Sequence, residues 1–410
     1  MSLKILHTAD WHLGKRLDYF SRFDEQKAVL EEIIAIADQE QVDVILVAGD
    51  LFDAFNPPVE AIELLYKTLK RLTNNGTRPV IAIAGNHDSP DRIDAPDSLA
   101  RDCGILFAGK PNMRFAPYQI ENGFEISKGD VGFLEIKLSH LDFPLRLIVT
   151  PFANEHRLKE YLGEDEQLGL NEVLTQKWQS LADQYCDSNG ANILVSHLYM
   201  NKKGGPVLEE PEGEKPLRIG FADTVFTDCI PSQIQYTALG HLHRYQEIGG
   251  HQAPVVYSSS PLCYSFSEAG QDKHVVIVTV QPQKEATYKT IALRSGKQLI
   301  RKKFNAVSDA IDWLQDHQDS LVELTLVSET SLTQAERKRI EDSHPGIIYL
   351  IPEVHSRRDG QQEVLISRRS KSINENFADY YRHRNNDQSP SEELLALFNE
   401  VLGTQNEKEN

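Results

Sequence analysis

The sequence of 410 residues predicts an α/β protein, followed by a smaller α+β domain and a helical tail. Three observations carry this prediction. Apolar runs rich in Val and Ile alternate with stretches of helical periodicity in the N-terminal part. Several of these runs are apolar at consecutive positions, which favours strands buried on both faces of a sheet. Beyond residue 281 the composition shifts, and strand-like and helix-like segments continue in a different pattern.

The first elements follow a strand–helix–strand order. Residues 24–40 place Val29, Ile33 and Ile36 among acidic side chains with helical spacing, and Pro57 and Pro58 interrupt the chain before the next helix. The order indicates crossover helices between parallel strands. The predicted elements are a strand over 3–9, a helix over 24–40, a strand in VDVILVAGD, a helix over 59–73 and a strand in RPVIAIAGNHD.

The rest of the first domain contains more strands than helices. Residues 91–104 are compatible with a helix, and residues 105–150 alternate strands with turns. An acidic helical stretch lies around 164–187, and 201–220 reads as an exposed loop. The later predicted strands are LRLIVTPF, ANILVSHLYM, YTALGHLHRYQEI, PVVYSSSPL and KHVVIVTVQ, which end the domain near residue 281.

The sequence divides into three predicted parts: 1–281, 285–355 and 356–410. The middle part combines strand-like TYKTIALR, LVELTLV and GIIYLIP with helices over 306–318 and 333–343. The last part is polar and basic over 357–384 and ends in a predicted helix over 389–402. Ser389 and Glu392 form a capping box at the start of this helix, which carries a stripe of Leu, Phe and Val.

Composition narrows the class of protein. The formal net charge of −18 argues against nucleic-acid binding, because phosphates attract Lys and Arg. Two divalent ions held by two carboxylates and neutral ligands would nevertheless leave a local charge of about +2. The four cysteines form no Cys-x-x-Cys pair, which excludes a zinc knuckle and a disulfide framework. Without a signal-like N-terminus or an apolar run that spans a bilayer, we expect a cytoplasmic protein.

Side chains that bind metals stand at the ends of the apolar runs. Carboxylate, imidazole and amide oxygen are ligands of hard and intermediate divalent ions. In α/β sheets, residues at the carboxyl ends of different strands converge on one crevice. A central Asp50 can bridge two ions, with one oxygen for each. The candidate metal ligands are Asp10, His12, Asp50, Asn86, His197, His241 and His243. The pattern predicts two-metal phosphoester hydrolysis.

His87 and Asp88 complete the segment Gly-Asn-His-Asp and are the candidate catalytic residues. A histidine whose second nitrogen is held by a carboxylate is suited to protonating a leaving oxygen. Each short motif alone is weak, since Gly-Asp at a strand end is commonly a turn. All the motifs together, each at a strand end, favour a site over coincidence. Other histidines lack this context and are expected to be structural or solvated: His140, His156, His251 and His317.

At these residues the chain resembles the calcineurin-like metallophosphoesterase family, whose pattern is D-x-H, G-D-x-x-D, G-N-H-D/E, a lone H and G-H-x-H. The resemblance implies a four-layer β-sandwich flanked by helices. It assigns one ion to Asp10, His12, Asp50 and His243, and the other to Asp50, Asn86, His197 and His241. It implies manganese, with magnesium or another divalent metal as alternatives. It also implies that His87 acts on the transition state or on the leaving group. At Asp53, some relatives have a second catalytic histidine, so its role stays open.

The flanking segments HTADWHLGKRL, VAGDLFDAFNPP, GNHDSPDR, LGHLHR and SSPLCYSFSE narrow the resemblance to DNA-repair nucleases of this family. It implies an exonuclease and endonuclease that works with a coiled-coil ATPase, since this chain has no Gly-x4-Gly-Lys-Ser/Thr motif. It also implies a homodimer through helices 59–73 and 91–103. Residues 285–355 then cap the DNA groove, and helix 389–402 docks on the ATPase.

Several alternatives stay open. The chain can instead be a phosphatase or small phosphodiesterase of the same family, or a mainly structural protein that tethers DNA. Leu64, Leu65 and Leu69 can face a dimer partner or pack in the core. Helix 389–402 can fold back on its own chain. For the basic stretch 357–384, a solvated linker is favoured over DNA contact.

Overall fold

The computed structural model describes residues 1–121, 123–152, 169–209 and 224–354, together with the single positions 390 and 394. The chain divides into two units, Met1–Val354 and His355–Asn410. The predicted helix over 389–402 and the basic stretch 357–384 therefore lie outside the described residues, except for Pro390 and Leu394. Within the described part, no helix is long and apolar enough to cross a membrane.

The first unit contains a six-stranded sheet built largely from the N-terminal segments. β1, β4, β5 and β6 are parallel, and β17 and β18 join antiparallel at one edge. The sheet order is β18 (Thr287–Ala292), β17 (His274–Val280), β1 (Leu3–Thr8), β4 (Val44–Ala48), β5 (Val80–Ile83) and β6 (Ile105–Ala108).

A second sheet of eight strands faces the first. Its central strands β10, β11, β14 and β16 are parallel. The order is β15 (Gln246–Glu247), β16 (Val255–Tyr257), β14 (Tyr236–Gly240), β11 (Ala191–His197), β10 (Leu145–Thr150), β9 (Phe133–Lys137), β8 (Glu125–Asp130) and β7 (Tyr118–Gln119).

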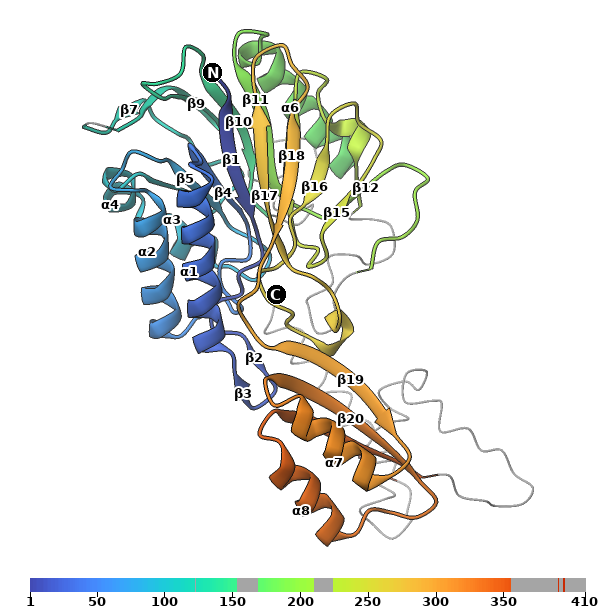
Figure 1. Cartoon of the computed structure of the whole chain (residues 1–410). Helices are drawn as coiled ribbons and strands as arrows, with labels where there is room; N and C mark the ends of the chain where they lie inside the picture. The colour runs from blue at the N-terminus through green and yellow to red at the C-terminus, as the bar shows by residue number, and fades with distance from the viewer. Residues whose placement is uncertain (122, 153–168, 210–223, 355–389, 391–393, 395–410) are drawn as a thin grey trace. The chain divides into compact units, whose positions relative to one another are not determined.

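Three apolar cores hold these elements in four layers. The central core lies between the sheets, where Leu46 and Ile193 meet. Val47, the next residue along β4, points to the other face and packs with α1 (Phe23–Gln39) and α2 (Val59–Leu72). Leu194 likewise packs outward with α6 (Leu170–Tyr185). Because consecutive strand residues point to opposite faces, runs buried on both sides are apolar throughout. The helix–sheet–sheet–helix order in Figure 1 confirms the four-layer sandwich.

The helices agree with the sequence except between 91 and 104. There the structure has two short helices, α3 (Pro90–Asp94) and α4 (Asp97–Asp102). Pro96 separates them, since proline lacks the N–H that would continue the hydrogen bonds of the first helix. Leu65 and Leu69 are fully buried in the core beneath α2, so core packing explains them and they do not face a partner.

The C-terminal region of this unit is a parallel three-stranded sheet of β19 (Gln298–Phe304), β20 (Ser320–Ser328) and β21 (Ile347–Val354). It packs with α7 (Val307–Asp316) and α8 (Gln334–Ser343) around its own core. The sequence did not reveal β19, because Arg301, Lys302 and Lys303 obscure its alternation. The strand over 287–292, expected in this region, pairs instead with β17 in the large sheet. The three-part division itself stays a prediction.

Short elements lie in the connections. A second small core, containing Leu17, Phe266 and Leu299, joins the three-stranded sheet to the N-terminal segments. The remaining elements are β2 (Arg16–Leu17), β3 (Phe20–Ser21), β12 (Met200–Asn201), β13 (Val225–Phe226), and the 3-10 helices η1 (Thr227–Cys229) and η2 (Phe266–Glu268).

Candidate metal centre

The metal-binding side chains lie at the carboxyl ends of strands from both large sheets. Asp10 and His12 follow β1, Asp50 follows β4, and Asn86 follows β5. From the second sheet, His197 ends β11, and His241 and His243 follow β14. Parallel registers align these strand ends within each sheet, which explains why residues distant in sequence meet there. Six of the seven are buried, and Asn86 is half-buried.

Asp50 stands at the middle of the cluster. Its Oδ2 atom lies 3.5 Å from Nε2 of His12 and 3.4 Å from Nε2 of His197. Its Oδ1 atom accepts a hydrogen bond of 2.9 Å from the backbone N–H of His87. The same carboxylate oxygen therefore faces both histidines. The expectation that each carboxylate oxygen serves a different ion stays a prediction.

The other ligands divide into two groups around Asp50. Nε2 of His12 and Nε2 of His243 are 3.0 Å apart, and Asp10 lies within 4.8 Å of this pair. On the other side, Nε2 of His197 is 2.9 Å from Oδ1 of Asn86. The ring of His241 is 5.6 Å from that of His197. The structure thus brings the seven candidate ligands together, with Asp10 and Asp50 between the two groups.

This arrangement fits divalent cations. Two imidazole nitrogens about 2.1 Å from one ion lie at about the separation seen for His12 and His243. Asp10 Oδ2 is buried and accepts no hydrogen bond from any residue that the structure describes. A buried anionic oxygen without a donor is costly, whereas a cation satisfies it. The donor set of oxygen and imidazole nitrogen indicates two ions of intermediate or hard character.

Protons compensate these charges when no cation is bound. Burial disfavours a charged His197, but the nearby carboxylates of Asp50 and Asp10 raise its pKa to about 9. Burial raises the pKa of Asp10 to about 7, with His197 opposing the rise and Asp50 adding to it. Burial alone would also raise the pKa of Asp50, but the histidine charges, led by His197, hold it well below its usual value. A metal ion must therefore displace protons here.

The backbone at the centre is strained. Asp10, His12, Asp50 and His241 have φ angles of 56°, 44°, 48° and 105°, values that L-residues rarely adopt. Such conformations concentrate at functional sites, where the surrounding structure enforces them. The close approach of Ala48 explains why a glycine precedes His241. A Cβ on Gly240 would lie 1.8 Å from the carbonyl oxygen of Ala48.

The outer nitrogens of the ligating histidines have different partners. Nδ1 of His197 is 2.9 Å from the carbonyl oxygen of Ala48. Nδ1 of His12 is 3.7 Å from Asp53 Oδ1, and Nδ1 of His243 is 3.4 Å from Glu268 Oε1. Partners of this kind set the orientation and the basicity of metal-bound imidazoles. Sequence reasoning left the role of Asp53 open and missed Glu268.

The two acidic partners stay ionised. Burial would raise the pKa of Asp53, but contacts with His12 and Lys15 lower it, and Lys15 Nζ is 2.9 Å away. Burial also opposes ionisation of Glu268, yet Lys273 and His243 bring its pKa well below the usual range. In the sequence, the capping-box spacing of Ser265 and Glu268 was the available signal, and it indicates only a local turn.

His87 and Asp88 lie beside the cluster but do not form the expected pair. Nδ1 of His87 is 2.7 Å from the carbonyl oxygen of Asp53. The carboxylate of Asp88 instead accepts hydrogen bonds of 2.8–3.0 Å from the backbone N–H groups of Leu51, Phe52 and Gly85. Burial and the nearby charge of Asp50 raise the pKa of Asp88 to about 6. Asp88 therefore holds the Asp50 and Asn86 loops together and does not orient His87.

The remaining histidines of the described part have other surroundings. His140 contacts Asp43, His251 contacts Ala253, and His317 stacks on Trp313. These positions agree with the structural role expected from the sequence. His156 lies outside the described residues.

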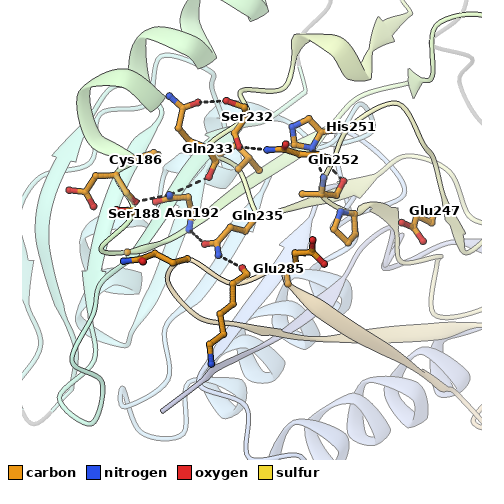
Figure 2. A pocket seen from close by; sticks show the side chains of 18 of the residues that line it. Cys186, Ser188, Asn192, Ser232, Gln233, Gln235, Glu247, His251, Gln252 and Glu285 are labelled. Atoms are coloured by element: carbon orange, nitrogen blue, oxygen red, sulfur yellow. Dashed lines mark hydrogen bonds between the residues drawn. The ribbon is translucent and has the colours of Figure 1, made fainter.

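A polar cavity of about 580 Å³ lies at the opposite ends of β11 and β14. Asn192 and Gln235 line it (Figure 2). The backbone N–H of Asn192 donates to Gln235 Oε1, and the side-chain N–H groups of both residues donate to backbone carbonyls. Asn192 Oδ1 accepts no hydrogen bond from the described residues. Among these residues, the clusters with metal-ligand geometry all lie at the other end of the sandwich.

Comparison with known proteins agrees with this geometry. A family model described as calcineurin-like phosphoesterase matches residues 3–245. The SbcD subunit of the nuclease SbcCD from Bacillus subtilis is 34% identical, with 97% of each chain covered. The protein of the same name from Staphylococcus epidermidis is 28% identical over 98% of this chain and 99% of its own. That from Rhodobacter capsulatus is 32% identical over 67% of this chain and 66% of its own.

Among solved structures, a dimetal phosphatase from Danio rerio covers 70% of this chain and 98% of its own at 10% identity. Its TM-score of 0.39 is too low to support an argument. The sequence matches alone establish the family, since the family model covers more than half of the chain and the Bacillus subtilis relative matches nearly all of it. The chain belongs to the calcineurin-like phosphoesterase family, in the group of the SbcD nucleases.

Proposed function

We propose that the chain is the nuclease component of an SbcCD-type complex and hydrolyses DNA phosphodiesters at the centre around Asp50. The observation that carries this proposal is the shared Oδ2 of Asp50, which faces His12 on one side and His197 on the other. A single oxygen between two sets of ligands suits a pair of ions. The relatives named as parts of the nuclease SbcCD supply the substrate class.

We assign one ion to Asp10, His12, Asp50 and His243, and the other to Asp50, Asn86, His197 and His241. Manganese is the proposed metal, as the family resemblance implies, and its carboxylate and amide oxygen ligands are of a kind that suits it. When bound, two such ions activate water and stabilise the charge on the scissile phosphate. Magnesium or another divalent metal is the alternative that metal-substitution assays test.

We assign His87 the protonation of the leaving oxygen. The Asp53 carbonyl oxygen can only accept, so Nδ1 of His87 carries a hydrogen. Nε2 is then the nitrogen that gains and gives up the second proton. The backbone N–H of His87 also donates to Asp50 Oδ1, which ties the position of the acid to that of the shared carboxylate. Asp88 acts through the loops that it joins.

The partners are DNA, the SbcC ATPase and a second copy of the chain. We propose that residues 285–355 shape the DNA groove and that the helix over 389–402 binds the coiled coil of SbcC. Dimerisation through α2, α3 and α4 would use exposed apolar side chains on these helices. Val59 is 77% exposed and Leu99 is 70% exposed, in contrast to the buried Leu65 and Leu69. A cytoplasmic location stays a prediction.

The test uses the purified full-length chain, with and without SbcC, on end-labelled duplex and hairpin DNA in the presence of manganese. We expect metal-dependent cleavage that His87→Ala lowers by about 100- to 10,000-fold. Cleavage of p-nitrophenyl phosphate but not of DNA would favour a phosphatase or small phosphodiesterase. DNA binding without cleavage, with or without SbcC, would favour a structural tethering protein. Either result would overturn the nuclease proposal.

A further inference from the structure

A buried ion pair lies directly behind the ligand His243. Glu268 ends η2, Lys273 precedes β17, and both side chains are almost fully buried. Lys273 Nζ is 2.5 Å from Glu268 Oε2 and donates a hydrogen bond of 2.7 Å to the carbonyl oxygen of His243. Glu268 Oε1 lies 3.4 Å from Nδ1 of the same histidine. The pair therefore contacts both the backbone and the ring of His243.

The surroundings hold this carboxylate in one orientation. Oε1 of Glu268 accepts hydrogen bonds of 3.1 Å from the backbone N–H groups of Tyr264 and Ser265. Oε2 accepts from Ser260 Oγ at 3.4 Å and from Lys273. A buried ion pair often stabilises a fold no better than apolar side chains of similar size. Its contacts with the ring and the backbone of His243, and not its burial, distinguish this pair.

The outer nitrogen of His197 in the second group has different partners. It lies 2.9 Å from the carbonyl oxygen of Ala48 and 3.7 Å from Oδ1 of Asp10, which is itself a candidate ligand. The outer nitrogens of His12 and His243 face Asp53 and Glu268, which are not among the candidate ligands. Each of these carboxylates is paired with a lysine. A carboxylate behind an imidazole makes that ligand more basic and fixes its orientation. His12 and His243 thus share a feature: the carboxylate behind each ring is paired with a lysine and is not itself a candidate ligand.

We propose that Glu268, held in place by Lys273, is a positioning residue that orients the imidazole of His243 and strengthens the ion position formed with Asp10 and His12. The inference rests on the proposed metal assignment. It predicts that the affinity for only one of the two ions depends on Glu268. Removing the carboxylate weakens one ion and leaves the ion of Asn86 and His197 unchanged.

The experiment measures manganese binding to the full-length protein by calorimetry at one pH. In Glu268→Gln, one of the two dissociation constants is expected to rise by about 10–100-fold, and the other to stay as in the wild type. Glu135→Gln is the matched control. Glu135 forms a similarly buried pair with Arg146, 2.9 Å apart at the start of β10, away from the ligands. This control is expected to lower the melting temperature without changing either constant.

A second variant separates positioning from folding. Glu268→Gln leaves Lys273 as a buried unpaired charge, which can prevent folding. Glu268→Gln combined with Lys273→Met removes both charges, and the same rise in one dissociation constant is expected. In a His243→Ala background, Glu268→Gln is expected to change manganese binding no further, because the ring that it orients is gone. A purely structural Glu268 would lower the melting temperature equally in both backgrounds.

The results that would overturn the inference are distinct from failure of the proposed function. If the wild type binds two manganese ions and both Glu268 variants bind them equally well, the positioning role is wrong. Equal weakening of both ions would also contradict it. If the wild type does not bind two manganese ions, the metal assignment itself fails. Circular dichroism of each ion-free protein shows whether a variant has folded.

Discussion

Two polar regions at opposite ends of the same strands differ in how their groups are matched. At the carboxyl ends of β11 and β14, His197 and His243 meet carboxylates and other imidazoles. At the amino ends, Asn192 and Gln235 line a cavity in which amide donors meet carbonyl acceptors (Figure 2). The cavity has a volume of about 580 Å³, yet the side-chain amides of Asn192 and Gln235 already donate to backbone carbonyls. The volume of a cavity is therefore not what marks a functional site in this protein.

The contrast shows which kind of polar cluster calls for a ligand. In the cavity, the side-chain N–H groups of Asn192 and Gln235 donate to backbone carbonyls, and the Asn192 Oδ1 atom that lacks a donor among the described residues is uncharged. In the metal centre, ring nitrogens face one another 3.0 Å apart and Asp10 Oδ2 is buried without a donor among the described residues. Left-handed backbone at four ligands adds strain. A cluster that its own donors and acceptors leave unbalanced requires a partner from outside.

The largest effect is expected from Asp50→Asn. This change removes charge from the oxygen that faces both groups of ligands, so the affinity for both ions should fall. Metal ions contribute several kcal/mol to the stabilisation of the transition state, and DNA cleavage should therefore fall by more than about 1000-fold. Calorimetry and cleavage of labelled DNA measure the two effects. Retention of both ions at wild-type affinity would contradict the central role of Asp50.

His87→Ala should separate chemistry from metal binding. General acid catalysis contributes about 100- to 10,000-fold, and cleavage should fall within this range. Manganese affinity should stay unchanged, because the His87 contact to Asp50 comes from the backbone. Asp88→Asn is the comparison variant, because it weakens the hydrogen bonds that Asp88 accepts from the backbone N–H groups of Leu51 and Gly85 and leaves the His87 ring in place. Weaker manganese binding in His87→Ala would show that His87 acts through the metal centre.

Metal affinity should weaken as pH falls. With its pKa near 9 in the ion-free protein, His197 carries a proton at neutral pH, and a bound ion must displace this proton. Between pH 9 and 7 the dissociation constant should rise by up to about tenfold per unit. Below pH 7, protonation of Asp10 should steepen the dependence. Calorimetry over this range in several buffers measures the released protons, and a flat profile would contradict the charge arrangement.

The smallest effect is expected in the cavity. Gln235→Ala removes hydrogen bonds to the carbonyls of Gln281 and Lys284 and from the N–H of Asn192. The free energy of unfolding should fall by about 1–2 kcal/mol. Denaturant unfolding measures this change, and manganese affinity and DNA cleavage should match the wild type. A loss of cleavage in this variant would break the contrast between the two regions.

Much of the architecture and the ligand set was predictable from local patterns. Apolar alternation and helical spacing located α1, α2 and the strands of both large sheets, since each element buries its own faces. Pro96 was visible in the sequence, but the break it causes between α3 and α4 was not anticipated. The charged strand β19 was also missed, because only its partner β20 makes it a strand.

The sequence by itself determined the chemistry of the site, because residue type and position at strand ends are local properties. The tertiary structure decided which atoms face one another. It placed one oxygen of Asp50 between two histidines. It also placed the carbonyl oxygen of Asp53 beside Nδ1 of His87, and Glu268 beside Nδ1 of His243. These contacts join segments up to 231 residues apart, as with His12 and His243. Packing of the two sheets brings them together, and no local sequence pattern encodes that approach.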